Sequence, residues 1–318
     1  INVGCIPSKR LITEAALAPK ENFALQKQYY KAAIENKNTL TSALRAANYN
    51  KLIESGVDVI DGTASFLNAS SVEVKSSDGK VQPIEAKKFV IDTGSYPFVP
   101  PALRTENNPH VYVSESIMDL TELPERLTVI GGGYIGLEFS SMYANFGSKV
   151  TIVQQEDTFL PREDADVAQS IRSVLENRGV KIITGAQTER IDDANLTYIQ
   201  DGKKYSLAGD AVLLAVGRRP NVDALHAEKA GIVQGTTAAR YGSSIIYLGG
   251  DIITQIDSIE VASIADYYSA LESKRPGDTV SVKVRRNGKD RTLTVTLTDA
   301  DSEERSPQPS RNSRTWQL

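Results

Sequence analysis

The stretch Leu127-Thr128-Val129-Ile130-Gly131-Gly132-Gly133-Tyr134-Ile135-Gly136 decides the fold of the middle of this chain. Its first four residues form a short strand of the buried type, and a turn of the form G-x-G-x-x-G follows at once. A helical run from Leu137 to Phe146 and a second strand from Lys149 to Val153 complete a βαβ unit within about 30 residues. The sequence therefore predicts a dinucleotide-binding unit, with a glycine turn that binds no ligand as the alternative.

Each glycine of the turn has its own predicted task. Gly131 makes the tight turn, Gly133 lets the backbone approach a pyrophosphate, and Gly136 lets helix and strand pack closely. The phosphates then meet the helix N-terminus. At the end of the second strand, where an acidic residue would bind a ribose hydroxyl, stands Gln154. An amide cannot pair with phosphate charge, so Gln154 favours NADH over NADPH, with a solvated strand end as the alternative.

Composition excludes several classes of function. The chain has 318 residues, a formal net charge of −4 and 24% charged residues, so it has no basic field for nucleic acid. A single cysteine, Cys5, excludes an internal disulfide and a thiolate zinc site. No apolar run reaches the roughly 18 residues of a membrane span. The length predicts two or three domains of a globular protein.

The flanking sequence divides by pattern. Ser8 to Glu54 predicts two helices interrupted near Pro19. The next stretch, up to Val99, predicts mostly sheet, with strands at Val57–Ile60, Ser71–Val74 and Phe89–Ile91 and turns at Asp61-Gly62 and Asp78-Gly79. A domain boundary is expected near Ser114, and strands and a helix continue to Arg218. Beyond Gly231 we expect a loop over 235–242, strands over 244–257, a helix over 264–272, and two strands joined by the turn Asn287-Gly288.

The first residues carry a second motif, Gly4-Cys5-Ile6-Pro7-Ser8-Lys9. It resembles the redox-active segment of the pyridine-nucleotide disulfide oxidoreductases, the family of mercuric reductase and dihydrolipoyl dehydrogenase. The resemblance implies a C-x-x-x-x-C pair whose second cysteine is Cys5 and whose first would precede Ile1, so we expect a chain truncated at its N-terminus. Lys9 and the helix start would favour the thiolate, and a buried, apolar cysteine is the alternative.

Further motifs are similar to this family in the same order over residues 1 to about 230. Gly62 and Ala64 match its G-x-A-x-F strand near the flavin adenine, and Thr93-Gly94 matches the A-T-G segment that closes the FAD domain, although Asp92 departs from the usual small residue. The resemblance implies that Tyr134 gates the nicotinamide pocket and that Glu138 pairs with Lys9. Gly217 begins a G-R-x-P-N signature, and Phe159–Asp164 is similar to the mercuric-reductase-like branch.

The resemblance also implies parts that this sequence does not match. The family's first βαβ unit, which holds the FAD pyrophosphate, would precede Ile1, and its dimerisation domain with a His-Glu pair has no match. His110 and His226 are expected in surface loops. We therefore expect the chain to bind flavin poorly and not to form the family's homodimer through that domain.

The last third resembles another family from about residue 231 to 299. Gly250-Asp251, Ala265–Leu271, Pro276–Val280 and Val284–Gly288 follow the order of the PDZ domain of Deg-type serine proteases. The early strand and carboxylate loop of such a domain, which capture a peptide, would fall before Gly231. A rival interpretation assigns Ile245–Asp251 to the reductase family's I-Y-A-x-G-D strand; the PDZ order is preferred. Residues 300–318 are expected to form a disordered tail.

The resulting prediction is an α/β fold: a Rossmann-like NAD(P)-binding domain (115–230) inserted in a partial FAD-binding domain (1–114), followed by a partial α+β PDZ-like domain (231–299). The predicted function is an FAD-dependent pyridine-nucleotide disulfide oxidoreductase in an incomplete form, which passes hydride from NAD(P)H through FAD to a thiol centre containing Cys5. Its acceptor would be a small molecule or dithiol, in the cytoplasm. The alternative is a non-catalytic fusion that binds NAD(H) and, through the PDZ-like part, a peptide; PDZ modules of this type suggest the cell envelope.

Overall fold

The computed structural model describes residues 3–232, 237–241, 244–248, 252–261, 264–275, 277–286 and 289–297. The chain divides into two compact units, one of Ile1–Ala230 with Tyr241–Ser244 and one of Gly231–Arg240 with Ile245–Leu318. Each unit has its own hydrophobic core. The predicted tail at 300–318 and the predicted turn at 287–288 lie outside the described residues.

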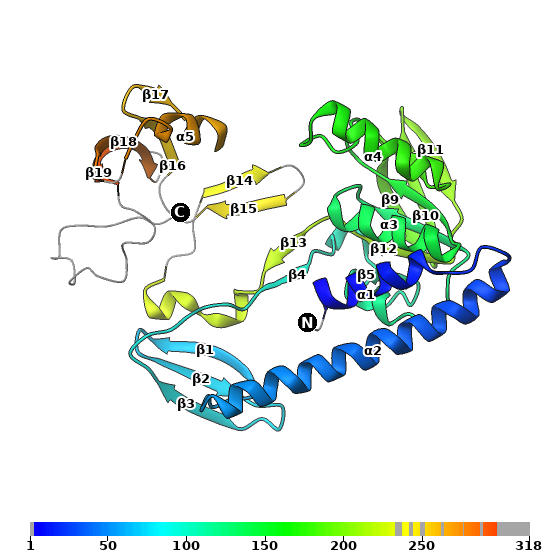
Figure 1. Ribbon diagram of the computed structural model, residues 1–318, viewed down its shortest axis with the longest axis horizontal. Coiled ribbons are helices and arrows are strands. Elements are labelled where there is room, and N and C mark those ends of the chain that lie inside the picture. The colour runs from blue at the N-terminus through cyan, green and yellow to red at the C-terminus, as the bar shows by residue number, and fades with distance from the viewer. Residues whose placement is uncertain are drawn as a thin grey trace. The chain divides into compact units, whose positions relative to one another are not determined.

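The centre of the first unit is a five-stranded parallel sheet in the order β5-β12-β6-β7-β8 (Figure 1). Its strands are β5 (Val111–Val113), β6 (Arg126–Ile130), β7 (Lys149–Val153), β8 (Lys181–Ile183) and β12 (Ala211–Leu214). The helices α3 (Tyr134–Phe146) and α4 (Ala165–Asn177) connect β6 to β7 and β7 to β8. The predicted βαβ unit is confirmed, although α3 begins at Tyr134, three residues before the predicted start at Leu137.

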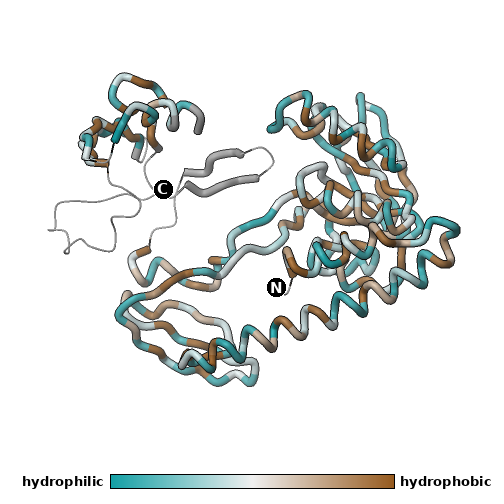
Figure 2. The backbone as a smooth tube through the Cα atoms, viewed as in Figure 1, coloured by the Kyte–Doolittle hydropathy of each residue, from teal (hydrophilic) through white to brown (hydrophobic). Residues whose placement is uncertain are grey.

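The sheet is covered on both faces, which explains why its strands are almost continuously apolar. On one face Leu127 and Val129 pack with α3 and with the helices α1 (Cys5–Ala16) and α2 (Phe23–Glu54). On the other face Ile130 and Val212 pack against an antiparallel sheet in the order β11-β10-β9. Its strands are β9 (Gln187–Asp192), β10 (Asn195–Gln200) and β11 (Lys203–Leu207). Figure 2 shows hydrophobic residues gathered where α3 meets the sheet.

A pair of buried phenols joins the helices to the loop before β6. The hydroxyls of Tyr30 and Tyr143 lie 2.8 Å apart, and they donate to the carbonyls of Leu120 and Ile117 at 2.9 and 3.0 Å. Burial raises the pKa of Tyr30 and of Tyr143 well above the ordinary value of a phenol. Both side chains therefore stay neutral and hydrogen-bonded inside the core.

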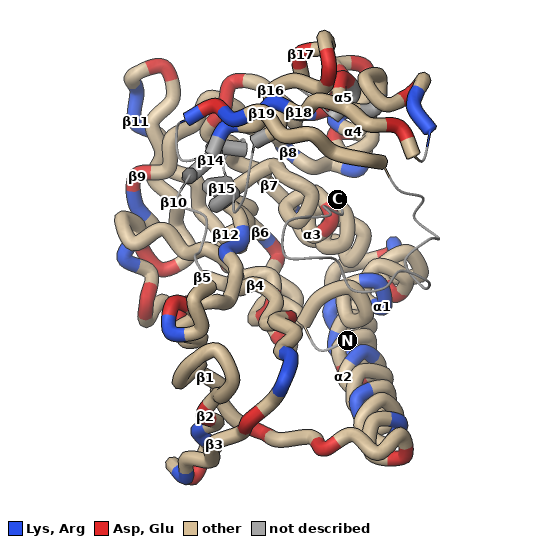
Figure 3. Tube along the Cα trace, turned by 90° about the vertical axis from the view of Figure 1, so that its left-hand side faces the viewer, with Lys and Arg blue, Asp and Glu red and all other residues tan. Residues whose placement is uncertain are grey.

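The two helices predicted from Ser8 to Glu54 are confirmed as α1 and α2, which are separated by a turn containing Pro19. The Asn22 side chain accepts a hydrogen bond from the Leu25 amide at 2.9 Å and so caps α2. Beyond Lys37 no residue of α2 is buried, and Figure 3 shows acidic and basic residues mixed along this helix. Its second half is therefore a solvated helix rather than part of the core.

The small sheet after α2 differs from the prediction. It has the order β1-β2-β3, with β1 (Thr63–Asn68), β2 (Ser71–Lys75) and β3 (Val81–Glu85). The strands predicted at Val57–Ile60 and Phe89–Ile91 are wrong, because both segments lie outside every strand of the described chain. Strand β3 was missed because Pro83 and its polar neighbours lack strand character; an edge strand tolerates such a proline.

The remaining elements of the first unit connect these sheets. The 3-10 turns are η1 (Pro101–Leu103), η2 (Ser116–Asp119), η3 (Asp223–Leu225) and η4 (Ala227–Ala230). Strands β4 (Ser95–Pro97) and β13 (Arg218–Pro220) pair antiparallel. They are the two segments that connect the β1-β2-β3 sheet to the parallel sheet, and we refer to them as the crossing of β4 and β13. The turns η3 and η4 then pack on β1. His110 and His226 are exposed in loops, as predicted.

The second unit holds a four-stranded antiparallel sheet in the order β17-β16-β18-β19. Its elements are β16 (Ile252–Ile256), β17 (Ile259–Glu260), β18 (Thr279–Arg286), β19 (Lys289–Thr296) and the helix α5 (Ile264–Leu271). A further two-stranded sheet pairs β14 (Thr237–Tyr241) with β15 (Ser244–Leu248). The loop expected over 235–242 is therefore wrong from Thr237 to Tyr241. Within the described part of the chain, no helix is both long and apolar enough to cross a membrane.

Candidate functional site

The glycine turn between β6 and α3 has the backbone of a phosphate-binding loop. Gly131 adopts a φ of +104°, and a Cβ there would lie 2.5 Å from the Ala215 carbonyl oxygen. A Cβ on Gly136 would lie 2.0 Å from the Gly131 carbonyl oxygen. Both positions therefore exclude any side chain: Gly131 for its turn, and Gly136 for the close approach of helix to strand.

Gly133 differs from these two glycines. Its backbone is extended (φ −80°, ψ −177°), and no atom beyond its chain neighbours lies within 4 Å of the place where a Cβ would stand. The fold itself does not need a glycine here. The space beside Gly133 is open, which fits a ligand that approaches the backbone closely.

The N-terminus of α3 is also suited to an anion. Gly133 is the N-cap, and no described side chain caps the helix or places an acidic group in its first turn. The amide groups of this first turn therefore have no side-chain acceptor, and the helix dipole favours a negative charge at this point. Together with the open space at Gly133, this arrangement fits the pyrophosphate of a dinucleotide.

Gln154 plays a different role from the one predicted. It is 8% exposed, so it is not a solvated strand end. Its side-chain oxygen accepts a hydrogen bond from the Gly132 amide at 2.6 Å, and its amide nitrogen donates to the Glu156 carboxylate. Gln154 therefore holds the Gly132 amide of the glycine turn and, through its other side-chain atom, the Glu156 carboxylate beside that turn. The sequence offered no signal that Glu156, three residues beyond the strand, belongs to this neighbourhood.

The segment from Gln154 to Asp164 folds back over the turn. The Phe159 ring is buried and would lie 3.3 Å from a Cβ on Gly132, and the Tyr134 hydroxyl donates to the Glu163 carboxylate. This contact joins Tyr134, the first residue of α3, to a residue 29 positions further along the chain. Sequence spacing alone could not have indicated it.

The cysteine motif lies on the neighbouring helix. Cys5 is the first residue of α1 and is exposed, so the alternative of a buried, apolar cysteine is wrong. Lys9 stands one turn further, and its ammonium donates to the Glu138 carboxylate on α3. The structure thus brings Lys9 and Glu138 together. Cys5 itself stands at the N-terminus of α1, where the helix dipole provides a positive potential.

The other predicted site residues lie on separate elements. Gly62 precedes β1, where a Cβ would lie 2.6 Å from the Val74 side chain, so this glycine serves strand packing. Ala64 pairs with Val74 inside the small sheet. Thr93 and Gly94 are exposed just before β4, and the Gly94 carbonyl accepts from the Asn221 amide at 2.9 Å.

The crossing of β4 and β13 is held by Arg218. Gly217, with a φ of +134°, accepts a hydrogen bond from the Phe98 amide at 2.9 Å. The next residue, Arg218, donates to the Ser95 carbonyl at 2.6 Å and pairs with Glu115 at 3.0 Å. The G-R-x-P-N segment therefore fixes the two strands that join the β1 region to the parallel sheet.

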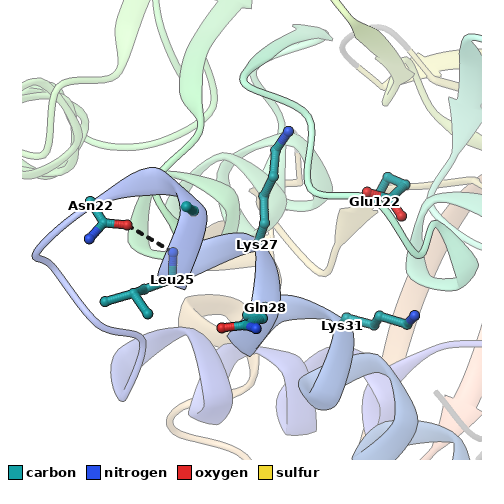
Figure 4. Close-up of a pocket in the computed structure, with 7 residues that line it drawn as sticks. Asn22, Leu25, Lys27, Gln28, Lys31 and Glu122 are labelled. Carbon is teal, nitrogen blue, oxygen red and sulfur yellow. Dashed lines mark hydrogen bonds between the residues drawn. The ribbon is translucent and has the colours of Figure 1, made fainter.

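A separate hollow of about 590 Å³ lies at the start of α2, and Figure 4 shows its lining. It is formed by Asn22, Ala24, Leu25, Lys27, Gln28, Lys31 and Glu122. It contains none of the predicted site residues. Among the described residues there is also no cluster of three metal-ligating side chains.

Comparison with known proteins places these features in one family. A family model described as pyridine nucleotide-disulphide oxidoreductase matches residues 1–265. The probable pyridine nucleotide-disulfide oxidoreductase RclA of Escherichia coli K12 is 42% identical over 233 residues, which cover 73% of this chain and 51% of that protein. A mercuric reductase of Lysinibacillus sphaericus is 30% identical over 283 residues, or 83% of this chain and 51% of that protein.

A solved structure agrees with the sequence matches. The Cu(II) complex of the HOCl-induced flavoprotein disulfide reductase RclA from Escherichia coli aligns with a TM-score of 0.65 and 31% identity, covering 95% of this chain and 69% of that one. This chain spans about half the length of the curated relatives it matches. The family match ends 35 residues beyond the boundary predicted at 230 and includes Ile245–Asp251, the segment with the rival reductase interpretation.

Proposed function

Because this chain belongs to the pyridine nucleotide-disulfide oxidoreductase family, we propose that it provides the nicotinamide-nucleotide site and one redox cysteine of a flavin-dependent disulfide reductase. The observation that carries the proposal is the glycine turn before α3. This turn combines an uncapped helix N-terminus with open space at Gly133. Glu138, on the same helix, is paired with Lys9 of the cysteine motif.

The residues of the turn fit NAD(P)H. The amides at the start of α3 would hold the pyrophosphate, Gly133 would let it approach, and Gly131 and Gly136 would keep the turn and helix in place. The bound nucleotide supplies a hydride. Tyr134, 69% exposed at the first position of α3, stands beside the entry to this site.

We also propose that NADH is preferred over NADPH. The support is local charge: the Glu156 carboxylate lies beside the glycine turn, held by Gln154. The strand β7 is followed by Gln154, Gln155 and Glu156, without an arginine or lysine that could pair with a 2′-phosphate. A carboxylate would accept from a ribose hydroxyl and repel the additional phosphate of NADPH.

FAD would contact the exposed Thr93 and Gly94 and the region of Gly62 and Ala64. The open surroundings of Gly94, where a Cβ would meet no atom within 4 Å, are compatible with a large ligand. When bound, FAD would supply the two-electron redox chemistry between the nicotinamide nucleotide and a disulfide. This sequence contains one G-x-G-x-x-G turn of the strand-turn-helix kind, and the proposal assigns it to the nicotinamide nucleotide. Retention of FAD by this chain alone is therefore expected to be weak.

The thiol chemistry is assigned to Cys5. Cys5 is exposed at the first residue of α1, so its sulfur is accessible to a small molecule. The Cys5 thiolate would attack one sulfur of a disulfide, form a mixed disulfide with it and release the other sulfur as a thiolate, so a small disulfide is the proposed electron acceptor. The Lys9–Glu138 pair joins the cysteine helix to α3, the helix that follows the glycine turn. Since NAD(P)H is the electron source, we place this activity in the cytoplasm.

A second function is proposed for the last part of the chain. The strands β18 and β19 lie beyond the end of the family match, and they form an antiparallel sheet with β16 and β17, accompanied by α5. This arrangement of sheet and helix is compatible with the PDZ-like order of the sequence, which suggests binding of an extended peptide. In this alternative the chain binds NAD(H) and a peptide without turnover.

Calorimetric titration with NADH, followed by an assay with excess FAD, tests these proposals. Heat of binding together with flavin absorbance and NADH oxidation supports the reductase. Heat without turnover supports the non-catalytic alternative, and titration with short peptides that carry a free C-terminal carboxylate then tests the PDZ-like part. The absence of NADH heat refutes both, because both assign the nucleotide to the glycine turn.

A further inference from the structure

Gln154 has a side chain with two polar ends, and the protein engages both of them. Its Oε1 atom accepts a hydrogen bond from the Gly132 amide at 2.6 Å, and its Nε2 atom donates to the Glu156 carboxylate. The residue is 8% exposed. Gln154 is therefore tied into the glycine turn, and its side chain joins that turn to Glu156.

The chemistry of these two contacts explains why a glutamine fits this position. The Gly132 amide needs an acceptor, and the Glu156 carboxylate needs a donor. A carboxamide offers both on one side chain, whereas an ionised glutamate at position 154 would offer acceptors alone. The residue type thus suits a bridge between a backbone amide and a carboxylate.

The backbone of Gln154 is held at the end of the parallel sheet. Its amide donates to the Ile183 carbonyl at 2.8 Å, and its carbonyl accepts from the Ala186 amide at 2.9 Å. The Phe159 ring, which is 5% exposed, lies close to Gly132, the residue that Gln154 contacts. Because both backbone groups are bonded and the side chain is buried, Gln154 is a rigid support.

Glu156 has no comparable support of its own. It is half-buried, and among the described residues its carboxylate has one hydrogen-bond partner, the Nε2 atom of Gln154. Its backbone carbonyl accepts from the Gly185 amide at 3.0 Å, which fixes the main chain but not the carboxylate. The orientation of the Glu156 carboxylate therefore depends on Gln154.

We propose that Gln154 is a positioning residue that sets the nucleotide preference: it holds the Glu156 carboxylate in one orientation beside the glycine turn, ready to accept from the ribose hydroxyls of NADH and to repel the 2′-phosphate of NADPH. The inference rests on the proposed nucleotide site. Without the donor, Glu156 samples further side-chain rotamers, and NADH must immobilise it, which lowers the affinity about three- to tenfold. A mobile carboxylate can turn away from the 2′-phosphate, so NADPH loses less.

The test measures the affinities of the whole chain for NADH and NADPH by calorimetry and compares their ratio. Gln154→Met removes both hydrogen bonds at similar side-chain volume and should lower the ratio of NADH to NADPH affinity about three- to tenfold. Glu156→Ala should lower this ratio at least as far, and adding Gln154→Met to it should lower the ratio no further. Gln155→Met, the same change at the exposed neighbouring glutamine, is the control and should leave the ratio unchanged.

The ratio of affinities separates positioning of Glu156 from support of the turn. If Gln154 served only the Gly132 amide, Gln154→Met would weaken NADH and NADPH by the same factor. Gln154→Glu keeps an acceptor for that amide, so it carries the same cycle with Glu156→Ala if Gln154→Met does not fold. The effect of Gln154→Glu on the ratio should then differ at least threefold between the chain with Glu156 and the Glu156→Ala background, because the cycle cancels the direct effect of the added charge.

Two results would overturn the proposal: equal losses for both nucleotides in Gln154→Met, or an effect on the ratio that is the same with and without Glu156. If the unmodified chain binds no NADH, or binds NADPH equally well, the proposed function fails and takes this inference with it. If the unmodified chain prefers NADH and Gln154→Met keeps that preference, only the role of Gln154 fails.

Discussion

Two alanine substitutions three residues apart should have opposite consequences, and their comparison tests the assignment of the nucleotide site. At Gly133 the backbone is extended and the position of a Cβ is free of neighbouring atoms. Gly133→Ala loses a favourable N-cap, at a cost of roughly 0.5 to 1 kcal/mol, and gains a similar amount from a less flexible unfolded chain. The free energy of unfolding should therefore change by less than about 0.5 kcal/mol.

Binding should respond in the opposite way at this position. The new methyl group would occupy the space through which the pyrophosphate reaches the amides of α3. Loss of one hydrogen bond to a charged group costs about 1.5 to 3 kcal/mol, which corresponds to a roughly 10- to 150-fold weaker affinity for NADH. Calorimetry on Gly133→Ala measures this loss directly, and thermal unfolding of the same sample measures its stability.

Gly136→Ala is the matched control. Its Cβ would lie 2.0 Å from the Gly131 carbonyl oxygen, so α3 must move away from β6 by about 1 Å to accept it. Overpacking of this kind costs about 3 kcal/mol, which lowers the melting temperature by roughly 6 to 12 °C in a unit of this size. If Gly133→Ala unfolds as early as Gly136→Ala, or binds NADH like the unmodified chain, the assignment of the turn is refuted.

Three further variants probe the core, the cysteine and a charge pair. Tyr143→Phe removes the hydroxyl that donates to the Ile117 carbonyl, which keeps its bond from the Leu120 amide, and should cost about 0.5 to 1.5 kcal/mol in urea unfolding at pH 7. Burial raises the pKa values of Tyr30 and Tyr143, so both phenols stabilise the fold fully below about pH 10 and lose that contribution at higher pH. Tyr143→Phe should therefore reduce the fall of the free energy of unfolding with pH above about pH 10. An unchanged slope of this free energy against pH contradicts the reasoning. Glu138→Gln removes the carboxylate that pairs with the Lys9 ammonium and should speed iodoacetamide alkylation of Cys5 at pH 7 severalfold. Lys9→Met removes the ammonium itself and should not speed alkylation. Equal alkylation rates in the two variants would exclude an effect of the Lys9 charge on Cys5. The hydrogen bond from Arg126 lowers the pKa of Asp210, so this pair stabilises the fold above about pH 4 and less as the pH falls. Asp210→Asn should therefore make the unfolding midpoint less dependent on pH in acid. An identical dependence in the variant would show that the pair does not stabilise the fold.

The parts of the fold that the sequence predicted are those with a strong local period or a specific turn. The βαβ unit was readable because buried strands, a glycine turn and a helix follow one another within about 30 residues. The helices α1 and α2 were readable from composition and from Pro19. The strand predicted at Val57–Ile60 failed because β-branched residues form a strand only where a partner strand is available. In this region β2 pairs with β1 and β3 instead.

The sequence predicted residues of the candidate site only where neighbours in sequence are also neighbours in space. Gly131, Gly133 and Gly136 act through the local backbone, so their spacing was enough. Gln154 was noticed by position, but no pattern shows that its side chain turns inward to the Gly132 amide. The contact of Tyr134 with Glu163 depends on how the segment after β7 packs, which is a property of the core.

The arrangement of α1 and α3 explains how two motifs that are distant in the sequence are held on neighbouring helices. Leu11 and Ala15 of α1 share a core with Phe139 and Met142 of α3, and the Lys9–Glu138 pair joins the exposed edge of the same two helices. An exposed ion pair contributes little to stability, about 0 to 1 kcal/mol, so the packed core fixes the helices and the pair fixes their register. Cys5 at the start of α1 and the glycine turn at the start of α3 are therefore held by helix packing. The proposed redox cysteine and nucleotide site would need a constant geometry, and a shared, close-packed core is the part of a protein that deforms least.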